Sequence, residues 1–416
     1  FPSSVFEYET GTENDHNFVV QEADQGGKLT PKYYKIVLKT NEIGTSEAIK
    51  WSTEPTGATG SVATGSVEVK LPNSDTPTKL YYTVENKYDP TLGTTRLTNL
   101  IEDVGNATQK VLFKGLTSDS SSAHGGAINN SSTDGYNIYA DFIGNYTSDS
   151  YNADGGAIYN SKNGTIGNIT GDFIGNYASS SSFAFGGAIY NSYKSTIGNI
   201  TGDFIGNYVS SSFTHSSSSY TQGGAINNYK GTIGNITGDF IGNYASSSSS
   251  DYDSDYSVYG GAVYNYGTIG DITGDFIGNY ASSPYDDAFG GAIYNDYKMT
   301  IGNITGDFIG NYASSSSSSS PAEGGAIYNY GTIRNITGDF IGNYASSARG
   351  KTKGGAIYNY NGTIGDITGD FIGNYASTSS YLDANGGAVY NYNGTIGDIT
   401  GDFIGNYASS PYDDVR

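Results

Sequence analysis

Apolar residues in most of this chain come in short clusters of four to eight residues, bounded by Gly, Asn or Ser. Two kinds of cluster alternate: one begins with Gly-Gly-Ala, as in 186–189, and the other reads ITGDFI, as in 200–205. Glycine interrupts the chain every few residues, and no helix-length stretch carries apolar residues at helical spacing. The pattern therefore predicts β-strands.

Both clusters recur nine times between residue 118 and the last residue. Gly-Gly-Ala begins at Gly125, Gly155, Gly186, Gly223, Gly260, Gly290, Gly324, Gly354 and Gly386. Phe-Ile-Gly-Asn begins at Phe142, Phe173, Phe204, Phe240, Phe276, Phe308, Phe340, Phe371 and Phe403, at intervals of 31 to 36 residues. Such a period indicates stacked units that cannot bury their apolar faces alone. We predict an all-β fold, a right-handed parallel β-helix of about nine coils, over 118–416.

Equivalent residues of successive coils should form columns along the solenoid axis. In NITGDF, alternation predicts that Ile200, Gly202 and Phe204 point inward and that Thr201 and Asp203 face water. Asn is expected in left-handed bends with its amide bonded to adjacent coils, and the glycines of FIGN and GTIG are expected to have positive φ. The predicted structural columns are represented by Phe173, Phe204 and Phe240 and by Asn176, Asn207 and Asn243.

Residues 1–117 do not repeat and form a separate predicted region. The segments KYYKIVLK (32–39), SVEVKL (66–71) and KLYYTVEN (79–86) are rich in β-branched and aromatic residues, which predicts strands. The open end of a solenoid exposes both core and unpaired backbone. We therefore expect 1–117 to be an N-terminal β-rich cap or domain, with 97–116 leading into the first coil.

The charge of the chain limits the classes of molecule that it is expected to bind. Of the net charge of −21, residues 118–416 carry −17, from 9 Lys/Arg against 26 Asp/Glu. Such an acidic array argues against nucleic acid and anionic membranes as partners. The chain has no Cys and no apolar run long enough to span a bilayer, and Phe1 is not a translation start. These features favour a processed, secreted protein.

One Asp precedes Phe in every repeat, so carboxylates should line up about 4.8 Å apart in successive coils. The simpler interpretation is a column of solvated charges. The alternative is weak Ca²⁺ binding, since Ca²⁺ prefers several oxygen ligands, with Asp203, Asp239 and Asp275 as the candidate ligands. No other cofactor is expected.

Length variation falls in one Ser- and Tyr-rich loop after FIGN-Tyr, which is longest in 209–222 and 245–259. Repeat proteins often place binding surfaces on the edge that carries insertions. Tyr is large, rigid and amphipathic, and so suits contact with proteins or glycans. The candidate binding residues are Phe213, Tyr220, Tyr252, Tyr256 and Tyr259.

The alternating GGAI and FIGN motifs resemble those of chlamydial polymorphic outer-membrane proteins. The resemblance covers about 118–416, with GGAV replacing GGAI at Gly260 and Gly386. It implies an autotransporter passenger with a right-handed parallel β-helix that acts in adhesion to host cells. The copies here are more alike than is usual in that family, and the Cys seen in some relatives is missing. The last repeat is incomplete at Arg416, which predicts a passenger cut from a longer protein or an array that continues.

The expected function is that of an extracellular, non-enzymatic bacterial adhesin or display passenger on the cell surface, with a protein or glycan ligand. The main alternative is a subunit of a head-to-tail extracellular filament, in which the partner is another copy of the chain. A polysaccharide-acting enzyme is a minor alternative. His16, His124 and His215 belong to no recognisable motif, and Asp251, Asp253 and Asp255 read as a solvated acidic loop.

Overall fold

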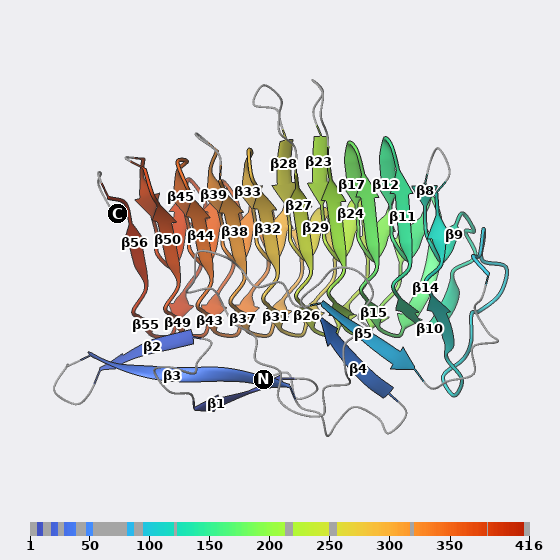
Figure 1. The fold of residues 1–416 in the computed structure, drawn as a ribbon, viewed down its shortest axis with the longest axis horizontal. Helices are drawn as coiled ribbons and strands as arrows, with labels where there is room; N and C mark the ends of the chain where they lie inside the picture. The colour runs from blue at the N-terminus through green and yellow to red at the C-terminus, as the bar shows by residue number, and fades with distance from the viewer. Residues whose placement is uncertain are drawn as a thin grey trace.

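The computed structural model describes residues 95–119, 123–212, 219–248, 256–316, 320–380 and 382–411, together with the backbone of five strands nearer the N-terminus. Every regular element in these residues is a β-strand, and no described helix could cross a membrane. The predicted right-handed parallel β-helix of about nine coils is confirmed. Figure 1 shows the coils stacked side by side along the long axis of the molecule, from teal to red.

Each coil is built from short strands that pair with their equivalents in the next coil. The third full coil contains β18 (Ile189–Asn191), β19 (Thr196–Ile197), β20 (Ile200–Thr201), β21 (Phe204–Ile205), β22 (Tyr208–Ser211) and β23 (Ser219–Gln222). The fourth contains β24 (Ile226–Ile233), β25 (Ile236–Thr237), β26 (Phe240–Ile241), β27 (Tyr244–Ser247) and β28 (Tyr256–Tyr259). All pairs between these coils are parallel, and like residues face each other in the repeated motifs, as Phe204 faces Phe240.

Parallel pairing begins before the first complete repeat. Leu97 pairs with Ile128, and β6 (Val111–Lys114) pairs with β10 (Tyr136–Ile143). Phe113 therefore lies at the start of the phenylalanine column, with its ring 5.2 Å from that of Phe142. The segment expected to lead into the first coil thus already contributes strand and core to it.

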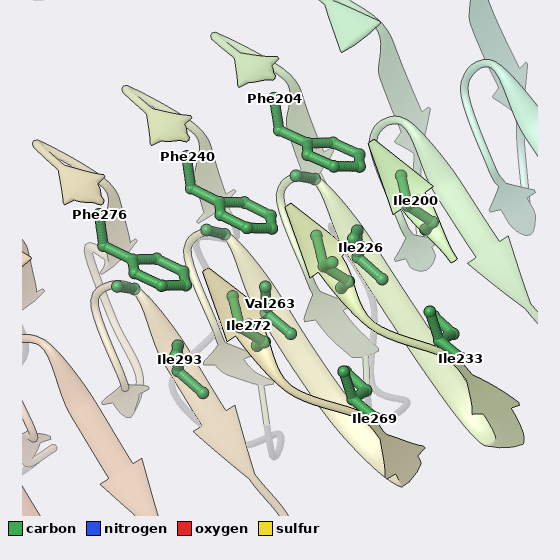
Figure 2. Close-up of a cluster of buried hydrophobic side chains, with 14 of the residues drawn as sticks. Ile200, Phe204, Ile226, Ile233, Phe240, Val263, Ile269, Ile272, Phe276 and Ile293 are labelled. Carbon is green, nitrogen blue, oxygen red and sulfur yellow. The ribbon is translucent and has the colours of Figure 1, made fainter. Parts of the chain in front are cut away.

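Stacked Phe, Ile and Ala side chains form the main core. Figure 2 shows Phe204, Phe240 and Phe276 one above another, with Ile226 and Val263 beside them. Neighbouring Phe rings in this part of the column lie 4.7–4.8 Å apart, nearly parallel, and all three are fully buried. The predicted column that includes Phe173, Phe204 and Phe240 is confirmed.

A second, thinner core lies between two flat sheets. One sheet has ten strands, from β7 (Thr117–Ser118) to β56 (Tyr407–Ser409), and the other has nine, from β8 (Ala123–His124) to β51 (Ala384–Asn385). The residues buried between them are Ala and Val, such as Ala178, Val209 and Ala245. Small side chains let the two sheets approach closely. In the chain, the segments that vary in length follow strands of the ten-stranded sheet and precede strands of the nine-stranded sheet.

The two asparagine columns are hydrogen-bonded from coil to coil and fully buried except in the last coil. Asn243 Nδ2 donates to Asn279 Oδ1 at 3.0 Å and to the Phe204 carbonyl at 2.7 Å, and Asn207 donates to Asn243 in the same way. Their predicted bonding role is confirmed. The prediction of left-handed backbone at these asparagines is wrong: positive φ occurs instead in the turn beyond the first column, as at Asn163.

Glycine is required at two positions of the repeat for two different steric reasons. Gly206 of FIGN has φ of +60°, as predicted, whereas Gly198 of GTIG does not have positive φ. A Cβ at Gly198 would lie 2.7 Å from Asn168 Oδ1 in the neighbouring coil. The GTIG glycine is therefore required for close approach between coils rather than for a left-handed bend.

The described N-terminal strands are antiparallel. β1 (Phe6–Thr10), β3 (Leu29–Leu38) and β2 (Phe18–Ala23) form one sheet in that order, and β4 (Glu47–Ser52) pairs with β5 (Tyr81–Asn86). The strands predicted in 32–39 and 79–86 are present, while 66–71 lies outside the described residues. A capping role for 1–117 stays a prediction.

Core positions of the last described coil are more exposed than those of the inner coils. Phe403 is 53% exposed, whereas the equivalent Phe371 is fully buried. Ile399 and Tyr407 of the same coil are also exposed. The same residue types are thus present in buried and exposed copies.

Candidate functional site

One side of the solenoid carries three parallel columns of aromatic rings, which we call the aromatic face. The first column lies on the nine-stranded sheet, the second follows each Gly-Gly-Ala segment, and the third lies in the next turn. The first column consists of Phe183, Phe185, Tyr220, Tyr259 and Phe289. The second consists of Tyr159, Tyr190, Tyr264, Tyr294, Tyr328, Tyr358 and Tyr390. The third consists of Tyr193, Tyr229, Tyr266, Tyr297, Tyr330, Tyr360 and Tyr392. Most neighbouring rings contact one another, with centroids 4.7–6.4 Å apart.

Burial is graded across the aromatic face. The middle column is largely covered, with Tyr264 6% and Tyr358 2% exposed, whereas Tyr193 and Tyr297 of the third column are 37% and 47% exposed. Burial raises the pKa of Tyr259 to about 12. The Tyr259 phenol is therefore neutral near pH 7. The buried middle column supports the third column.

Polar contacts within the aromatic face are few and specific. The Tyr264 hydroxyl donates to Asp296 Oδ2 at 2.7 Å. Lys353 Nζ lies 2.6 Å from Glu323 Oε1 and 5.1 Å from the centroid of the Tyr358 ring. The surface thus combines apolar ring faces with a small number of charges.

Two of the five predicted binding residues belong to this face. Tyr220 on β23 and Tyr259 on β28 have ring centroids 6.3 Å apart. Phe213 and Tyr252 lie outside the described residues, and Tyr256 is described only by its backbone. The prediction overlooked the third column, although its signal was present as a Tyr that follows most Tyr-Asn or Asn-Asn pairs after Gly-Gly-Ala.

A different tyrosine column follows FIGN on the ten-stranded sheet. Its rings stack face to face, as for Tyr244 and Tyr280 at 4.8 Å with a tilt of 1°. Tyr280, Tyr312 and Tyr344 are each less than a tenth exposed. This column covers a corner of the solenoid and is set apart from the aromatic face.

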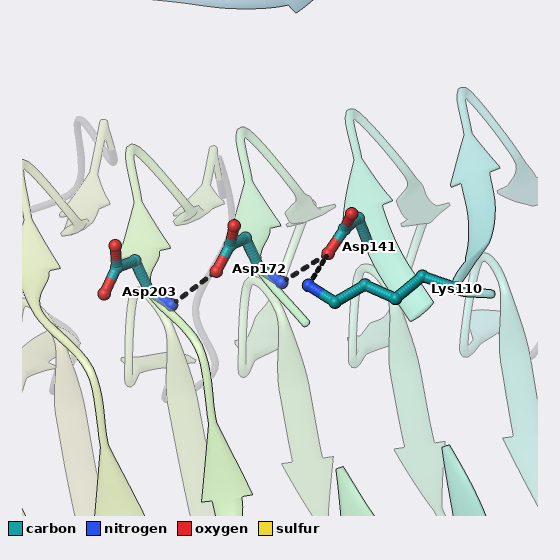
Figure 3. A network of polar contacts seen from close by, with 4 residues as sticks. All are labelled: Lys110, Asp141, Asp172 and Asp203. Atoms are coloured by element: carbon teal, nitrogen blue, oxygen red, sulfur yellow. Dashed lines mark hydrogen bonds and ion pairs between the residues drawn. The ribbon is translucent and has the colours of Figure 1, made fainter. Parts of the chain in front are cut away.

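The aspartates before Phe form a hydrogen-bonded column rather than a solvated one. Figure 3 shows Asp141, Asp172 and Asp203 in successive coils, with Oδ1 of each accepting the backbone N–H of the next. The series continues through Asp239 and Asp275, which are only 7% and 5% exposed. Asp203 itself is half-buried and its Oδ1 accepts the Asp239 N–H, so the expectation that it faces water holds only in part. The chain bends at Gly202, which separates β20 from β21, and this bend turns the aspartate along the axis.

Calcium binding by Asp203, Asp239 and Asp275 stays a prediction. One oxygen of each carboxylate is occupied by the backbone bond to the next coil. Within the described part of the chain, no three carboxylate or imidazole side chains are grouped so that they could share a metal ion. Oδ2 of Asp275 is buried without a hydrogen-bond partner.

Burial gives the aspartate column a definite pH dependence. Desolvation is the largest cause that raises the pKa of Asp172, to about 6, and it also raises the pKa values of Asp203, Asp275 and Asp339. A carboxyl group with a raised pKa binds its proton more tightly in the folded state than in the unfolded state, where its pKa is about 4. The stabilisation that the protonated carboxyl group gives to the folded state is complete below pH 4 and is lost as the pH rises through about 6.

We expect Asp172→Asn to stabilise the protein at pH 7 by about 2 kcal/mol relative to the wild type, and to leave its stability at pH 4 nearly unchanged. The asparagine Oδ1 can still accept the Asp203 N–H, while the charge is removed. Thermal unfolding of both proteins from pH 4 to pH 7.5 measures the difference. Asp402→Asn, at an exposed site, is the control and should show a much smaller change. A difference independent of pH would contradict the assignment.

A histidine–carboxylate pair lies at the edge of the aromatic face. His124 Nδ1 is 3.1 Å from Asp154 Oδ2, and the His124 ring stacks on Tyr159 with centroids 4.3 Å apart. Burial is the main cause that raises the pKa of Asp154. The pair was missed because its members come from adjacent coils and no sequence motif links them.

The function of this chain has to be inferred from its fold and its aromatic face rather than from similarity to a known protein. No protein-family model, curated protein or solved structure matches this chain.

Proposed function

We propose that this protein is a non-enzymatic adhesin or display passenger that acts outside the cell and binds its ligand through the aromatic face. The observation that carries the proposal is the third column of tyrosines, which packs against a buried column of tyrosines. Tyr193 and Tyr297 of the third column are exposed, and Tyr229, Tyr266, Tyr330 and Tyr360 are half-buried. Its ligand is a protein or glycan of the host or the extracellular surroundings.

The physical basis is preorganisation. Tyr side chains offer large contact areas with few rotatable bonds, and repeat proteins present them on long, continuous surfaces. The strands that carry these rings are paired on both sides in the inner coils, as β29 (Val263–Ile269) pairs with β24 and with β34 (Ile293–Asn295). Binding therefore needs little ordering of the protein, which lowers the entropic cost of association.

Composition and the family resemblance support the extracellular part of the proposal. The chain has no Cys, is strongly acidic, and is rich in Gly, Ser and Tyr. Its GGAI and FIGN motifs resemble those of adhesive autotransporter passengers. A non-enzymatic role is proposed because the aromatic face repeats from coil to coil, whereas catalysis needs a unique constellation of groups.

We expect the double variant Tyr297→Ala, Tyr330→Ala to bind at least tenfold more weakly than the wild type, because truncation of central aromatic contacts removes much of the binding energy. The measurement is retention on a panel of immobilised glycans and on cultured epithelial cells. Tyr407→Ala removes a similarly exposed ring from a different sheet and is the matched control. Equal losses in both proteins would contradict the proposal. Sedimentation of the wild type as polymers, without ligand retention, would favour the filament alternative.

A further inference from the structure

Six non-glycine residues in the described part of the chain have left-handed backbone, and all lie in the turn of the third aromatic column. They are Asn163, Lys194, Lys230, Lys298, Asn361 and Asn393, with φ between 51° and 63°. Asparagine adopts this conformation readily, whereas lysine does so at a steric cost. Three coils therefore carry Lys where three equivalent coils carry the residue that suits the backbone.

Backbone strain of this kind is retained where a side chain has a function. The side chains of Lys194, Lys230 and Lys298 are exposed. No described carboxylate lies at ion-pairing distance from these three ammonium groups. Strain without an ion pair indicates that these lysines serve something other than folding.

Each of these lysines lies against a tyrosine of the third column. Lys194 Nζ is 5.2 Å from the centroid of the Tyr193 ring, and Lys298 Nζ is 4.6 Å from that of Tyr297. Lys230 Nζ lies 5.4 Å from the Tyr229 centroid and is shared with the tyrosine of the next coil. A positive charge is thereby held beside an exposed ring in the third and sixth coils and beside a half-buried ring in the fourth.

The basic residues of the array are concentrated on this side. Residues 118–416 contain only 9 Lys and Arg, and four of them, Lys162, Lys194, Lys230 and Lys298, lie in these turns. The nearest acidic neighbour in sequence is Asp296, whose Oδ2 accepts the Tyr264 hydroxyl. At physiological salt, charges further away than about 8 Å are largely screened, so the local lysines decide what binds here.

We propose that the Tyr–Lys stripe, formed by Tyr193, Lys194, Tyr229, Lys230, Tyr297 and Lys298, binds an acidic polysaccharide that runs along the solenoid axis. The sugar rings stack on the tyrosines, and the carboxylate or sulfate groups pair with the lysines. The inference rests on the proposed function and names the ligand class for the same face.

The repeat geometry suits a polymer of sugars. A pyranose ring is about as long as the rise from one coil to the next, so successive sugars can meet successive coils. Exposed hydroxyl groups of Thr196, Thr232 and Thr300 follow the stripe in the same turns and can bond to sugar hydroxyls. Nucleic acid is disfavoured because it demands dense positive charge, whereas the stripe offers a single lysine in each of three coils.

The test compares the wild type with the triple variant Lys194→Asn, Lys230→Asn, Lys298→Asn. Asn is native at the equivalent positions Asn163 and Asn361, so we expect an equal or higher melting temperature. The matched control, Lys114→Asn, Arg349→Asn, Lys351→Asn, removes three exposed positive charges elsewhere. The probes are polygalacturonate, heparin, neutral cellohexaose and single-stranded oligothymidylate, each with the full chain.

We expect the wild type to bind polygalacturonate or heparin, the triple variant to bind them at least tenfold more weakly, and the control to stay within twofold. Equal losses in both variants, or oligothymidylate binding as tight as that of the acidic glycans, would overturn the inference. Cellohexaose binding that depends on Tyr297 and Tyr330, without binding of acidic glycans, would overturn it while the proposed function stands. Absence of binding to all probes and to cells would overturn both.

Discussion

Asn243→Asp is expected to lower the free energy of unfolding by about 3–5 kcal/mol, because it buries a charge without a counter-charge. Asn243 is fully buried and donates from Nδ2 to two oxygens, the Phe204 carbonyl and Asn279 Oδ1. Aspartate has the same shape but presents an oxygen to both acceptors. The variant therefore loses two donated bonds and gains repulsion at the centre of the column.

The control for this prediction is supplied by the chain itself. Asn199 occupies an exposed column in which other coils already carry aspartate, as at Asp271 and Asp366. Asn199→Asp should therefore change stability by less than about 0.5 kcal/mol. Guanidinium denaturation of both variants and of the wild type gives the comparison. Similar free energies of unfolding for both variants would show that the buried asparagine bonds contribute little.

Phe240→Ala is expected to cost about 3–5 kcal/mol, since it opens a cavity in a fully buried stack. The Phe240 ring lies 4.8 Å from Phe204 and 4.7 Å from Phe276, so its removal takes a partner from each neighbour (Figure 2). Coils on either side are held by backbone pairing and cannot collapse into the space.

Phe403→Ala makes the same change in the last described coil, where the ring is 53% exposed and, among the described side chains, stacks on Phe371 alone. We expect it to cost less than half as much as Phe240→Ala. Denaturant unfolding, with hydrogen exchange in β26 as a local measure, tests the difference. Equal costs at both positions would mean that stacking on one face, rather than burial between two rings, supplies the stability.

The repeat made most of the solenoid predictable. Phe204 and Asn207 recur at one position in every unit, and a coil that winds once per unit must stack them. Gly206 could be assigned a positive φ because the chain must turn between two short strands there. Each of these conclusions depends only on the period and on local residue preference.

At Asp203, prediction from the period and from local residue preference was not sufficient. Alternation placed it on a water-facing side, but Gly202 breaks the strand and directs the carboxylate to the next coil's backbone. Gly198 was misassigned in a similar way, because its constraint is the side chain of Asn168 in another coil. A single repeat does not contain the atoms that decide either position.

The candidate site was predictable in part. Tyr220 and Tyr259 were selected from the long loops, and their rings lie within the aromatic face. The exposed tyrosines of the third column were overlooked, because one repeat does not show which of its several tyrosines are left uncovered. The left-handed backbone of the three lysines could not be predicted for a related reason, because the φ angle is set by the conformation of the folded turn.

The amino-acid sequence by itself determined the winding of the chain, the length of each coil and the identity of the buried columns, because these follow from periodicity and side-chain chemistry. Only the tertiary structure decided which polar residues are covered, which tyrosines face solvent and where lysine is held in a left-handed turn. The physical reason is that burial and backbone strain depend on the neighbouring coil, whose contacts are made only when the units stack.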